Sequence, residues 1–282
     1  MALLLPRPIA AQTPASAAPP ASRVTFDLGV AVTHDRSTWH FDNASSFDTT
    51  ALVPHFFEQQ YWSDHRWLRM DVGYRAGGMR WHTTVGVTAP IVARADDFDT
   101  FVQPSGDVVV SGTTGLASQR AWSVAQRASR GAGAVTWFVE YAWRRDRAGF
   151  HAGEKIVSHT APPGHATSIV TTREFTTGDL QDVRVGIAAR AALPRAWALR
   201  VDADASPVSV ARLVVSLPDK YPGRALAFAA LDWSAGARVA LAREGVWRVA
   251  VGAEARAARG YRDTGSLDRD TLALVATFGR AW

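Results

Sequence analysis

The sequence predicts an all-β chain folded as an antiparallel up-and-down transmembrane β-barrel of about ten strands. Three observations predict this class. Apolar residues recur at every second position along most of the chain, short Gly- and Pro-containing turns alternate with longer connecting segments, and the last alternating segment ends on an aromatic residue. Because no apolar stretch reaches about eighteen residues, no transmembrane helix is expected, and only a closed barrel would satisfy the backbone in lipid.

Composition is consistent with one large β-domain. The chain has 282 residues, of which 47% are hydrophobic and 20% charged, and no internal linker separates two cores. Since it contains no cysteine, no disulfide can contribute to its stability. The net charge of +5 would suit nucleic-acid binding, but the arginines are spread through alternating strands. This distribution favours a polar lumen and a surface facing anionic head groups, and no nucleic-acid partner is predicted.

The N-terminal segment 1–22 resembles the end of a secretory signal. It opens on an apolar run and passes through Ile9, Ala10 and Ala11 into a Pro/Ala-rich stretch, with cleavage expected after Ala11. We therefore divide the chain into a partial signal peptide with its leader, 1–22, and a single barrel domain, 23–282.

Strands are predicted wherever apolar and polar residues alternate, since one face of a barrel strand meets lipid and the other the lumen. A β-sandwich also alternates, but with a polar outer face and shorter strands. The apolar positions of the nine clearest segments are Val24, Phe26, Leu28 and Val30; Leu68, Met70, Val72 and Tyr74; Met79, Trp81, Val85 and Val87; Val135, Trp137, Val139, Tyr141 and Trp143; Val183, Val185, Ile187 and Ala189; Trp197, Leu199, Val201 and Ala203; Leu231, Trp233, Ala235, Ala237 and Val239; Trp247, Val249 and Val251; and Leu272, Leu274, Ala276, Phe278 and Trp282.

The connections complete the strand count. Short turns are predicted at 76–78, 129–133, 193–195 and 243–245, and longer loops at 34–64, 91–118, 150–178, 214–222 and 259–266. Four turns interleaved with five loops require ten strands, of which the fourth is placed at 122–128. The longer loops are expected outside the cell.

The inward positions carry charges of both signs. Because about ten strands enclose a space that side chains largely fill, these charges are expected to pair across the lumen and close it. A general pore is therefore not expected, although a narrow selective channel remains an alternative. The predicted inward charges are Arg69, Arg75, Arg80, Glu140, Arg184, Arg190, Arg200, Asp202, Asp204, Asp232, Arg238, Arg248, Glu254 and Arg256.

Strand number, turn lengths and loop lengths resemble the omptin family of outer-membrane proteases. That family carries an Asp-x-Asp pair in its second long loop, which maps onto Asp97 and Asp99, so the resemblance implies that these are catalytic carboxylates of a surface endopeptidase. The family also carries an Asp-x-His dyad in its fourth long loop, whose histidine helps to activate water. Here the segment 214–222 contains Asp219 and no histidine. A base would have to come from His40, His55 or His159.

Other readings of the same residues stay open. The three aspartates Asp96, Asp97 and Asp99 also fit a solvated acidic loop. Asp202 and Asp204 fit either a carboxylate pair or ion pairs with lumen arginines such as Arg200, Arg238 or Arg248. A girdle at the lipid interface and an external binding surface explain Tyr61 and Trp62 equally well, and the girdle also includes Trp67. The residues that fit the external binding surface are Trp39, His40, Phe41, Phe56, Phe57, Tyr61 and Trp62.

Histidine spacing predicts no metal site. His82 shares an inward face with Thr84, while His151, His159 and His165 lie in the third loop without the short spacing of zinc ligands. We predict no metal and no cofactor.

We expect a barrel in the outer membrane of a Gram-negative-type bacterium. Its expected role is a surface, structural or ligand-binding one through external loops, with an omptin-like endopeptidase as the alternative. Expected partners are outer-membrane lipid and lipopolysaccharide, and the barrel assembly machinery through Phe278 and Trp282, because an aromatic C-terminal strand resembles the insertion signal of such barrels.

Overall fold

A computed structural model describes residues 24–41, 55–102, 108–131, 133–159, 165–170, 173–216, 218, 222–223, 225–261 and 266–282. Within these ranges, residues 41, 55–57, 99–102, 108–111, 151–159, 165–170 and 226 are described by their backbone alone. No helix long and apolar enough to cross a membrane occurs among the described residues. The strands are β1 (Val24–Phe41), β2 (His55–Ala76), β3 (Met79–Thr88), β4 (Ile91–Val102), β5 (Val108–Arg130), β6 (Val135–His159), β7 (His165–Val170), β8 (Glu174–Ala192), β9 (Trp197–Ser216), β10 (Leu226–Arg243), β11 (Trp247–Gly260) and β12 (Ser266–Ala281).

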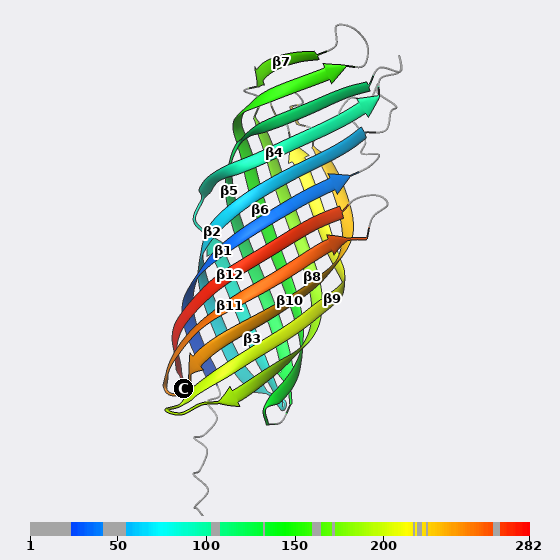
Figure 1. Ribbon diagram of the computed structural model, residues 1–282. Coiled ribbons are helices and arrows are strands. Elements are labelled where there is room, and N and C mark those ends of the chain that lie inside the picture. Colours follow the sequence, from blue (N-terminus) through cyan, green and yellow to red (C-terminus); the bar gives the residue numbers. More distant parts are fainter. Residues whose placement is uncertain are drawn as a thin grey trace, which may run out of the picture.

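These segments form ten barrel strands, as the sequence predicted. β3 and β4 pair in succession with the same neighbours, β2 and β5, so they are two parts of one strand. Likewise β7 and β8 follow one another along β6. Each neighbouring pair is antiparallel, and β1 pairs with β12 from Thr25↔Ala281 to His40↔Ser266, which closes the sheet (Figure 1).

The predicted alternation is confirmed by the exposure of the side chains. Outward apolar residues form a belt around the barrel, with Leu274 69%, Val251 60% and Ile187 60% exposed. Inward neighbours are buried, as at Asp27 and Glu140. An exposed apolar surface of this extent is unstable in water, because folding normally removes such groups from it. The belt therefore faces lipid, and the barrel is a transmembrane one.

The strands extend well into the segments predicted as loops, so those loop boundaries were wrong. β4 and β5 occupy most of 91–118, and β6, β7 and β8 occupy most of 150–178. The fourth strand, predicted at 122–128, is β5, which spans Val108–Arg130. Polar residues on both faces obscured these extensions in the sequence, since above the lipid a strand no longer needs an apolar outer face. All of them lie at the end of the barrel opposite the C-terminus (Figure 1).

A β-bulge at Ala89 and Pro90 reverses the two faces of the third barrel strand. Between the pairs Trp67↔Thr88 and Tyr61↔Ala95, β3 and β4 contain one residue more than β2. Proline suits this position because it has no N–H to donate to the ladder. Odd-numbered residues such as Val85 point outward before the bulge, whereas even-numbered Val92 and Phe98 do so after it. Asp97 consequently points inward.

Short turns join the strands at the C-terminal end of the barrel. Gly77 and Gly78 have φ values of 59° and 74°, and together they form the two-residue hairpin between β2 and β3. A turn with positive φ at both central residues matches the twist of the flanking strands, which explains the glycine pair. In transmembrane barrels short turns face the periplasm and long extensions face outward. We name the two ends of this barrel periplasmic and extracellular accordingly.

The assignment of faces predicts the effect of a charge in the belt. We expect Val249→Arg, which introduces a guanidinium on the lipid side of β11, to lower the free energy of unfolding by about 2–4 kcal/mol. Thr38→Arg, on the outward side of β1 beyond the belt, should change it by less than about 1 kcal/mol. Urea titration of protein refolded into vesicles measures both, and equal costs at the two positions would contradict the assignment.

Candidate functional site

The lower lumen is filled by paired charges. The guanidinium of Arg127 binds Glu140 and Asp202, both at 2.8 Å, and Arg184 binds Glu140 at 2.8 Å and Asp182 at 2.7 Å. Burial of a charge is costly unless it is paired and hydrogen-bonded, and these arginines meet that requirement by bridging between strands. Paired charges are thus present in the lumen, as expected, although the predicted Arg69, Arg75 and Arg80 form no ion pair among the described residues.

The partners of two predicted lumen aspartates differ from those expected. Asp202 pairs with Arg127 from β5 across the lumen, and Asp204 pairs with Arg256 at 2.7 Å. The sequence suggested Arg200, Arg238 or Arg248 because these lie on nearby strands, but curvature of the barrel brings more distant strands together. Both aspartates have cationic partners, which supports the ion-pair reading over a catalytic pair.

A second charged layer lies above the first and joins β1, β6 and β12. Arg144 binds Asp35 and Asp146, both at 2.9 Å, and Arg269 binds Asp146 at 2.9 Å. The hydroxyl of Thr271 donates to Asp35 at 2.5 Å. Two carboxylates and two guanidiniums thus form one neutral cluster.

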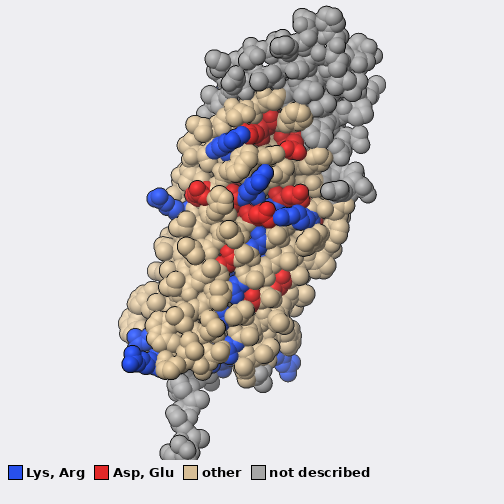
Figure 2. All heavy atoms as spheres, in the orientation of Figure 1, with Lys and Arg blue, Asp and Glu red and all other residues tan. Residues whose placement is uncertain are grey.

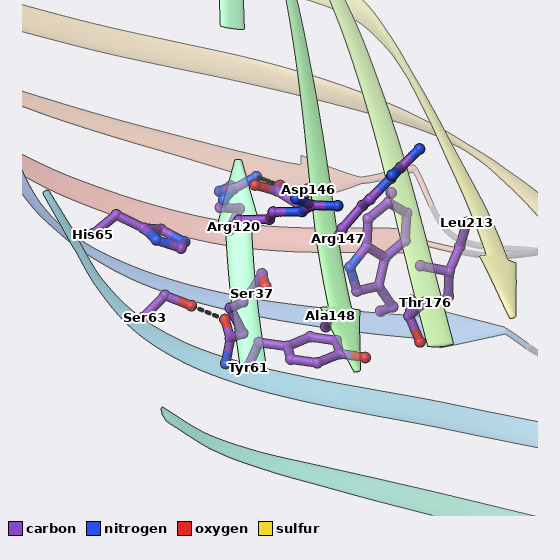
Figure 3. A pocket seen from close by; sticks show the side chains of 14 residues that line it. Ser37, Tyr61, Ser63, His65, Arg120, Asp146, Arg147, Ala148, Thr176 and Leu213 are labelled. Carbon is purple, nitrogen blue, oxygen red and sulfur yellow. Dashed lines mark hydrogen bonds and ion pairs between the residues drawn. The ribbon is translucent and has the colours of Figure 1, made fainter. Parts of the chain in front are cut away.

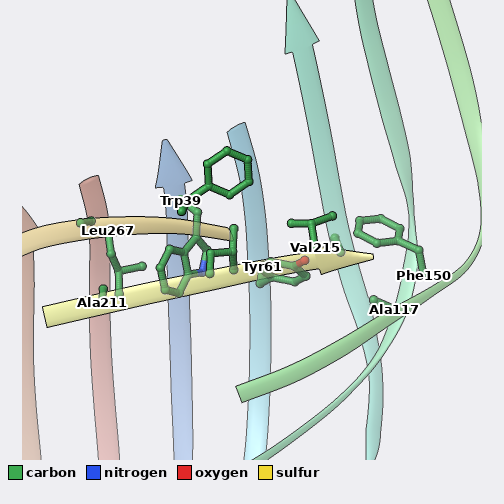
Figure 4. Packing of buried hydrophobic residues seen from close by; sticks show 11 residues of the cluster. Trp39, Tyr61, Ala117, Phe150, Ala211, Val215 and Leu267 are labelled. Atoms are coloured by element: carbon green, nitrogen blue, oxygen red, sulfur yellow. The ribbon is translucent and has the colours of Figure 1, made fainter. Parts of the chain in front are cut away.

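An apolar layer closes the lumen above these charges. It contains aromatic, branched and small side chains contributed by strands on all sides, so side chains meet across the barrel (Figure 4). This apolar packing lies above the two charged layers in the lumen. The buried members of the layer are Trp39, Tyr61, Ala95, Ala117, Phe150, Ala211, Leu213, Val215, Phe228, Ala230 and Leu267.

Asp97, one of the two predicted catalytic residues, lies in the extracellular part of the lumen. The amide nitrogen of Gln59 donates to Asp97 at 3.2 Å and also to Glu174. The Gln59 oxygen accepts from the Tyr61 hydroxyl at 2.8 Å and from Thr176 at 3.2 Å. The structure therefore brings together two carboxylates bridged by one amide, a constellation that the sequence did not reveal because its members come from three distant segments.

The remaining candidates of this region do not join that constellation within the described structure. Asp96 points outward and binds Arg94 at 2.7 Å. His40 points outward and contacts Glu58 at 3.4 Å. The side chains of Asp99, His55, His151, His159 and His165 lie outside the described residues. Among the histidines with described side chains, none is hydrogen-bonded to Asp97.

The aromatic residues of the first loop and second strand divide between the two faces. Tyr61 and Trp67 are buried in the lumen, at 6% and 7% exposure, so their assignment to a lipid girdle was wrong. Trp39 is also buried inside, at 4% exposure, so it does not form an external surface. Only Trp62 of these three tryptophans points outward, as the period of two along β2 requires.

Outward arginines and tryptophans gather directly beyond the apolar belt, on the neighbouring strands β1, β2, β4, β5 and β6. On the face drawn in Figure 2, charged side chains are likewise concentrated above a largely uncharged zone. We call this set the Arg–Trp band. Its guanidinium–indole contacts are Arg36 and Arg94 over Trp62 at 5.9 and 4.8 Å, Arg120 and Arg147 over Trp122 at 4.9 and 5.4 Å, and Arg145 over Trp143 at 5.4 Å.

Several arginines of this region have no carboxylate partner among the described residues. These are Arg36, Arg66, Arg120 and Arg147. By contrast, Arg94 and Arg145 bind Asp96 and Asp179, each at 2.7 Å. Stacking on indole holds a guanidinium in place while leaving its N–H groups free to donate. The band therefore presents guanidinium N–H groups that can bind an anion, beside carboxylates such as Asp64 and Asp96.

The bulge of the third barrel strand opens an outer groove within this band. It has a volume of about 470 Å³ and is lined by Trp62, Asp64, Arg66, Val92 and Arg94, among others. Its lining combines two arginines, an indole and the carboxylate of Asp64, which contacts His34, with apolar residues that continue the belt. Such a mixture suits a ligand with an anionic head and an apolar body.

An arginine pair binds Glu244 at the opposite, periplasmic rim. Arg190 and Arg200 each contact the Glu244 carboxylate at 2.6 Å. Burial raises the pKa of this carboxyl, but the hydrogen bonds from the two guanidiniums outweigh burial and hold the pKa at about 2. Glu244 follows β10 in a turn, so this interaction joins the β8–β9 and β10–β11 hairpins outside the membrane.

The fold is similar to that of a solved outer-membrane barrel. The outer membrane protease OmpT from Escherichia coli matches with a TM-score of 0.61 over 92% of this chain and 97% of its own, at 7% identity. The Pseudomonas putida toluene transporter TodX matches at a TM-score of 0.33 and 9% identity, over 93% of this chain and 90% of its own. The β domain of the Bordetella autotransporter BrkA matches at a TM-score of 0.36 and 12% identity, over 90% of this chain and 100% of its own. No family model and no curated protein matches the sequence. The similarity to OmpT shows a common barrel architecture, and an identity of 7% transfers no activity.

The pKa of Glu244 predicts a pH-dependent stability. Because folding lowers this pKa from 4.5 to about 2, the stabilisation is complete above pH 4.5 and is lost as the pH falls towards 2. We expect Glu244→Gln to lower the free energy of unfolding by about 1–3 kcal/mol at neutral pH, and the difference from wild type to shrink below pH 4.5. Unfolding titrations across this range measure it, and a difference independent of pH would contradict the assignment.

Proposed function

We propose that this chain is an occluded outer-membrane barrel with a non-enzymatic role at the cell surface, and that its Arg–Trp band binds the phosphate groups of lipopolysaccharide. One observation carries the proposal. Arg36, Arg120 and Arg147 stack on outward tryptophans at the extracellular edge of the belt, without a carboxylate partner among the described residues.

The chemistry of the band matches this ligand. Guanidinium groups bind phosphate through paired N–H donors, and tryptophan prefers the level of the head groups. Below the band, outward residues such as Val32 and Val124 offer an apolar surface to acyl chains. The groove beside Arg66 and Trp62 provides a recess at the level where a phosphate would meet the barrel.

The other features of the barrel support a surface role. The layered lumen disfavours both a general pore and a narrow channel, because apolar packing and paired charges fill it. Extended strands raise the extracellular end above the belt and present it to the medium (Figure 1). We also propose insertion through the C-terminal strand, where Phe278 and Trp282 are 57% and 58% exposed.

The lipid proposal predicts a loss of binding on removal of the unpaired cations. We expect the triple variant Arg36→Gln, Arg120→Gln, Arg147→Gln to bind purified lipopolysaccharide roughly a hundred-fold more weakly, since each basic residue near a membrane surface contributes about 1 kcal/mol. Retained lipopolysaccharide after purification and calorimetric titration of detergent-exchanged protein measure the effect.

An arginine that stacks on tryptophan at the periplasmic rim provides a matched control. Arg280 stacks on Trp247 and Trp282 at 5.4 and 5.6 Å, but at the periplasmic end. Arg280→Gln should leave lipopolysaccharide binding unchanged. Equal binding by the triple variant and by wild type would contradict the proposal.

A second candidate function is surface proteolysis of the omptin kind, favoured by the inward carboxylates of Asp97 and Glu174 in a barrel with OmpT-like architecture. In that case whole cells displaying the protein should cleave quenched fluorescent peptides that include dibasic sites. The variant Asp97→Asn, Asp99→Asn should lower this cleavage at least about 100-fold. Absence of cleavage by correctly inserted protein would exclude this function and leave the lipid proposal intact.

A further inference from the structure

A small cavity lies between the upper charged layer and the apolar layer (Figure 3). Its volume is about 30 Å³, and seven strands contribute to its walls. Ser37, Ser63, His65, Gln119, Asp146, Thr176 and Arg269 supply polar groups, while Trp39, Tyr61 and Leu213 line its extracellular side.

Three buried polar atoms in this wall have no hydrogen-bond partner among the described residues. They are Nδ1 of His65, Nε2 of Gln119 and Nε of Arg269, in residues that are 2%, 5% and 8% exposed. Leaving a buried polar atom unsatisfied costs about 1–3 kcal/mol, and native proteins seldom do so. All three side chains line the same small space.

The orientation of the Gln119 amide does not remove the need for a ligand. The Ser63 hydroxyl donates to the amide oxygen of Gln119. If the amide were turned over, its nitrogen would donate to Ser63 and its oxygen would become the unsatisfied atom. In either orientation one polar atom of Gln119 requires a further partner.

The size and charge of the surroundings identify the ligand class. About 30 Å³ of the cavity is open to the centre of a water molecule, which is enough for at least one water. The neighbouring cluster of Asp35, Asp146, Arg144 and Arg269 is neutral in sum, and Arg120 and Arg147 also contribute to the wall. Water both donates and accepts, and therefore suits either amide orientation and either tautomer of His65.

We infer that this cavity is a structural water site, in which a single water molecule links His65 of β2 to Gln119 of β5. These strands do not pair with each other at this height, because β4 lies between them. The Ser63 hydroxyl of β2 already donates to Gln119 across the bulged strand. The water adds a second connection between β2 and β5, through His65. This inference is independent of the proposed lipid binding.

A crystal structure of the full chain, at a resolution that orders internal water, tests the site directly. We expect one density peak within hydrogen-bonding distance of both His65 and Gln119, and no anomalous signal there after a bromide soak. Absence of the peak, or rotation of the two side chains into direct contact, would overturn the inference. An anomalous bromide peak would do so too, by showing that the site binds an anion.

A double-mutant cycle provides a second measurement. His65→Leu and Gln119→Leu should show non-additive shifts in the urea midpoint, because either change removes one of the two groups that the water connects. The control pair is His82→Leu with Gln119→Leu, since His82 lies lower in the lumen beside Asp71 and does not line the cavity. Additive shifts in both pairs would contradict a shared water. The wild-type crystal decides the question even where a variant fails to fold.

Discussion

Closure of the sheet through backbone hydrogen bonds is the constraint on which the rest of this structure depends. In lipid no water is present to satisfy an open strand edge, so each strand needs a neighbour on both sides. The pairing of β1 with β12 meets that need, and it joins residues from opposite ends of the chain. Once the sheet is closed, the period of two fixes which side chains face lipid and which face the lumen.

Closure also determines what the interior must contain. A barrel of this size leaves no room for a wide channel, so inward charges have to be neutralised by one another. Arg127 and Arg144 do so by each binding two carboxylates. The apolar layer above them consists of buried hydrophobic side chains and has no charge to neutralise. Beneath it, His65 and Gln119 each have a buried polar atom without a hydrogen-bond partner among the described residues.

Departures from regular pairing lie where the structure offers sites for function. The bulge at Pro90 turns Asp97 into the lumen and opens the outer groove beside Trp62 and Arg66. A regular strand would have left Asp97 on the outer face. One inserted residue thus shapes both the polar constellation at the extracellular end and the recess in the Arg–Trp band. Bulges are commonly placed at functional positions for this reason.

The sequence alone determined the fold class, the ten strands, the periplasmic turns and the two faces of the membrane-spanning segments, because the period of two and the turn residues are local properties. The sequence analysis misplaced the extracellular ends of the strands. There the outer face is polar, so apolar and polar residues no longer alternate. Partners within the lumen, such as Arg127 for Asp202 and Gln59 for Asp97, were decided only by the tertiary structure. Barrel closure sets distances between strands far apart in the chain, and no spacing along the sequence records those distances.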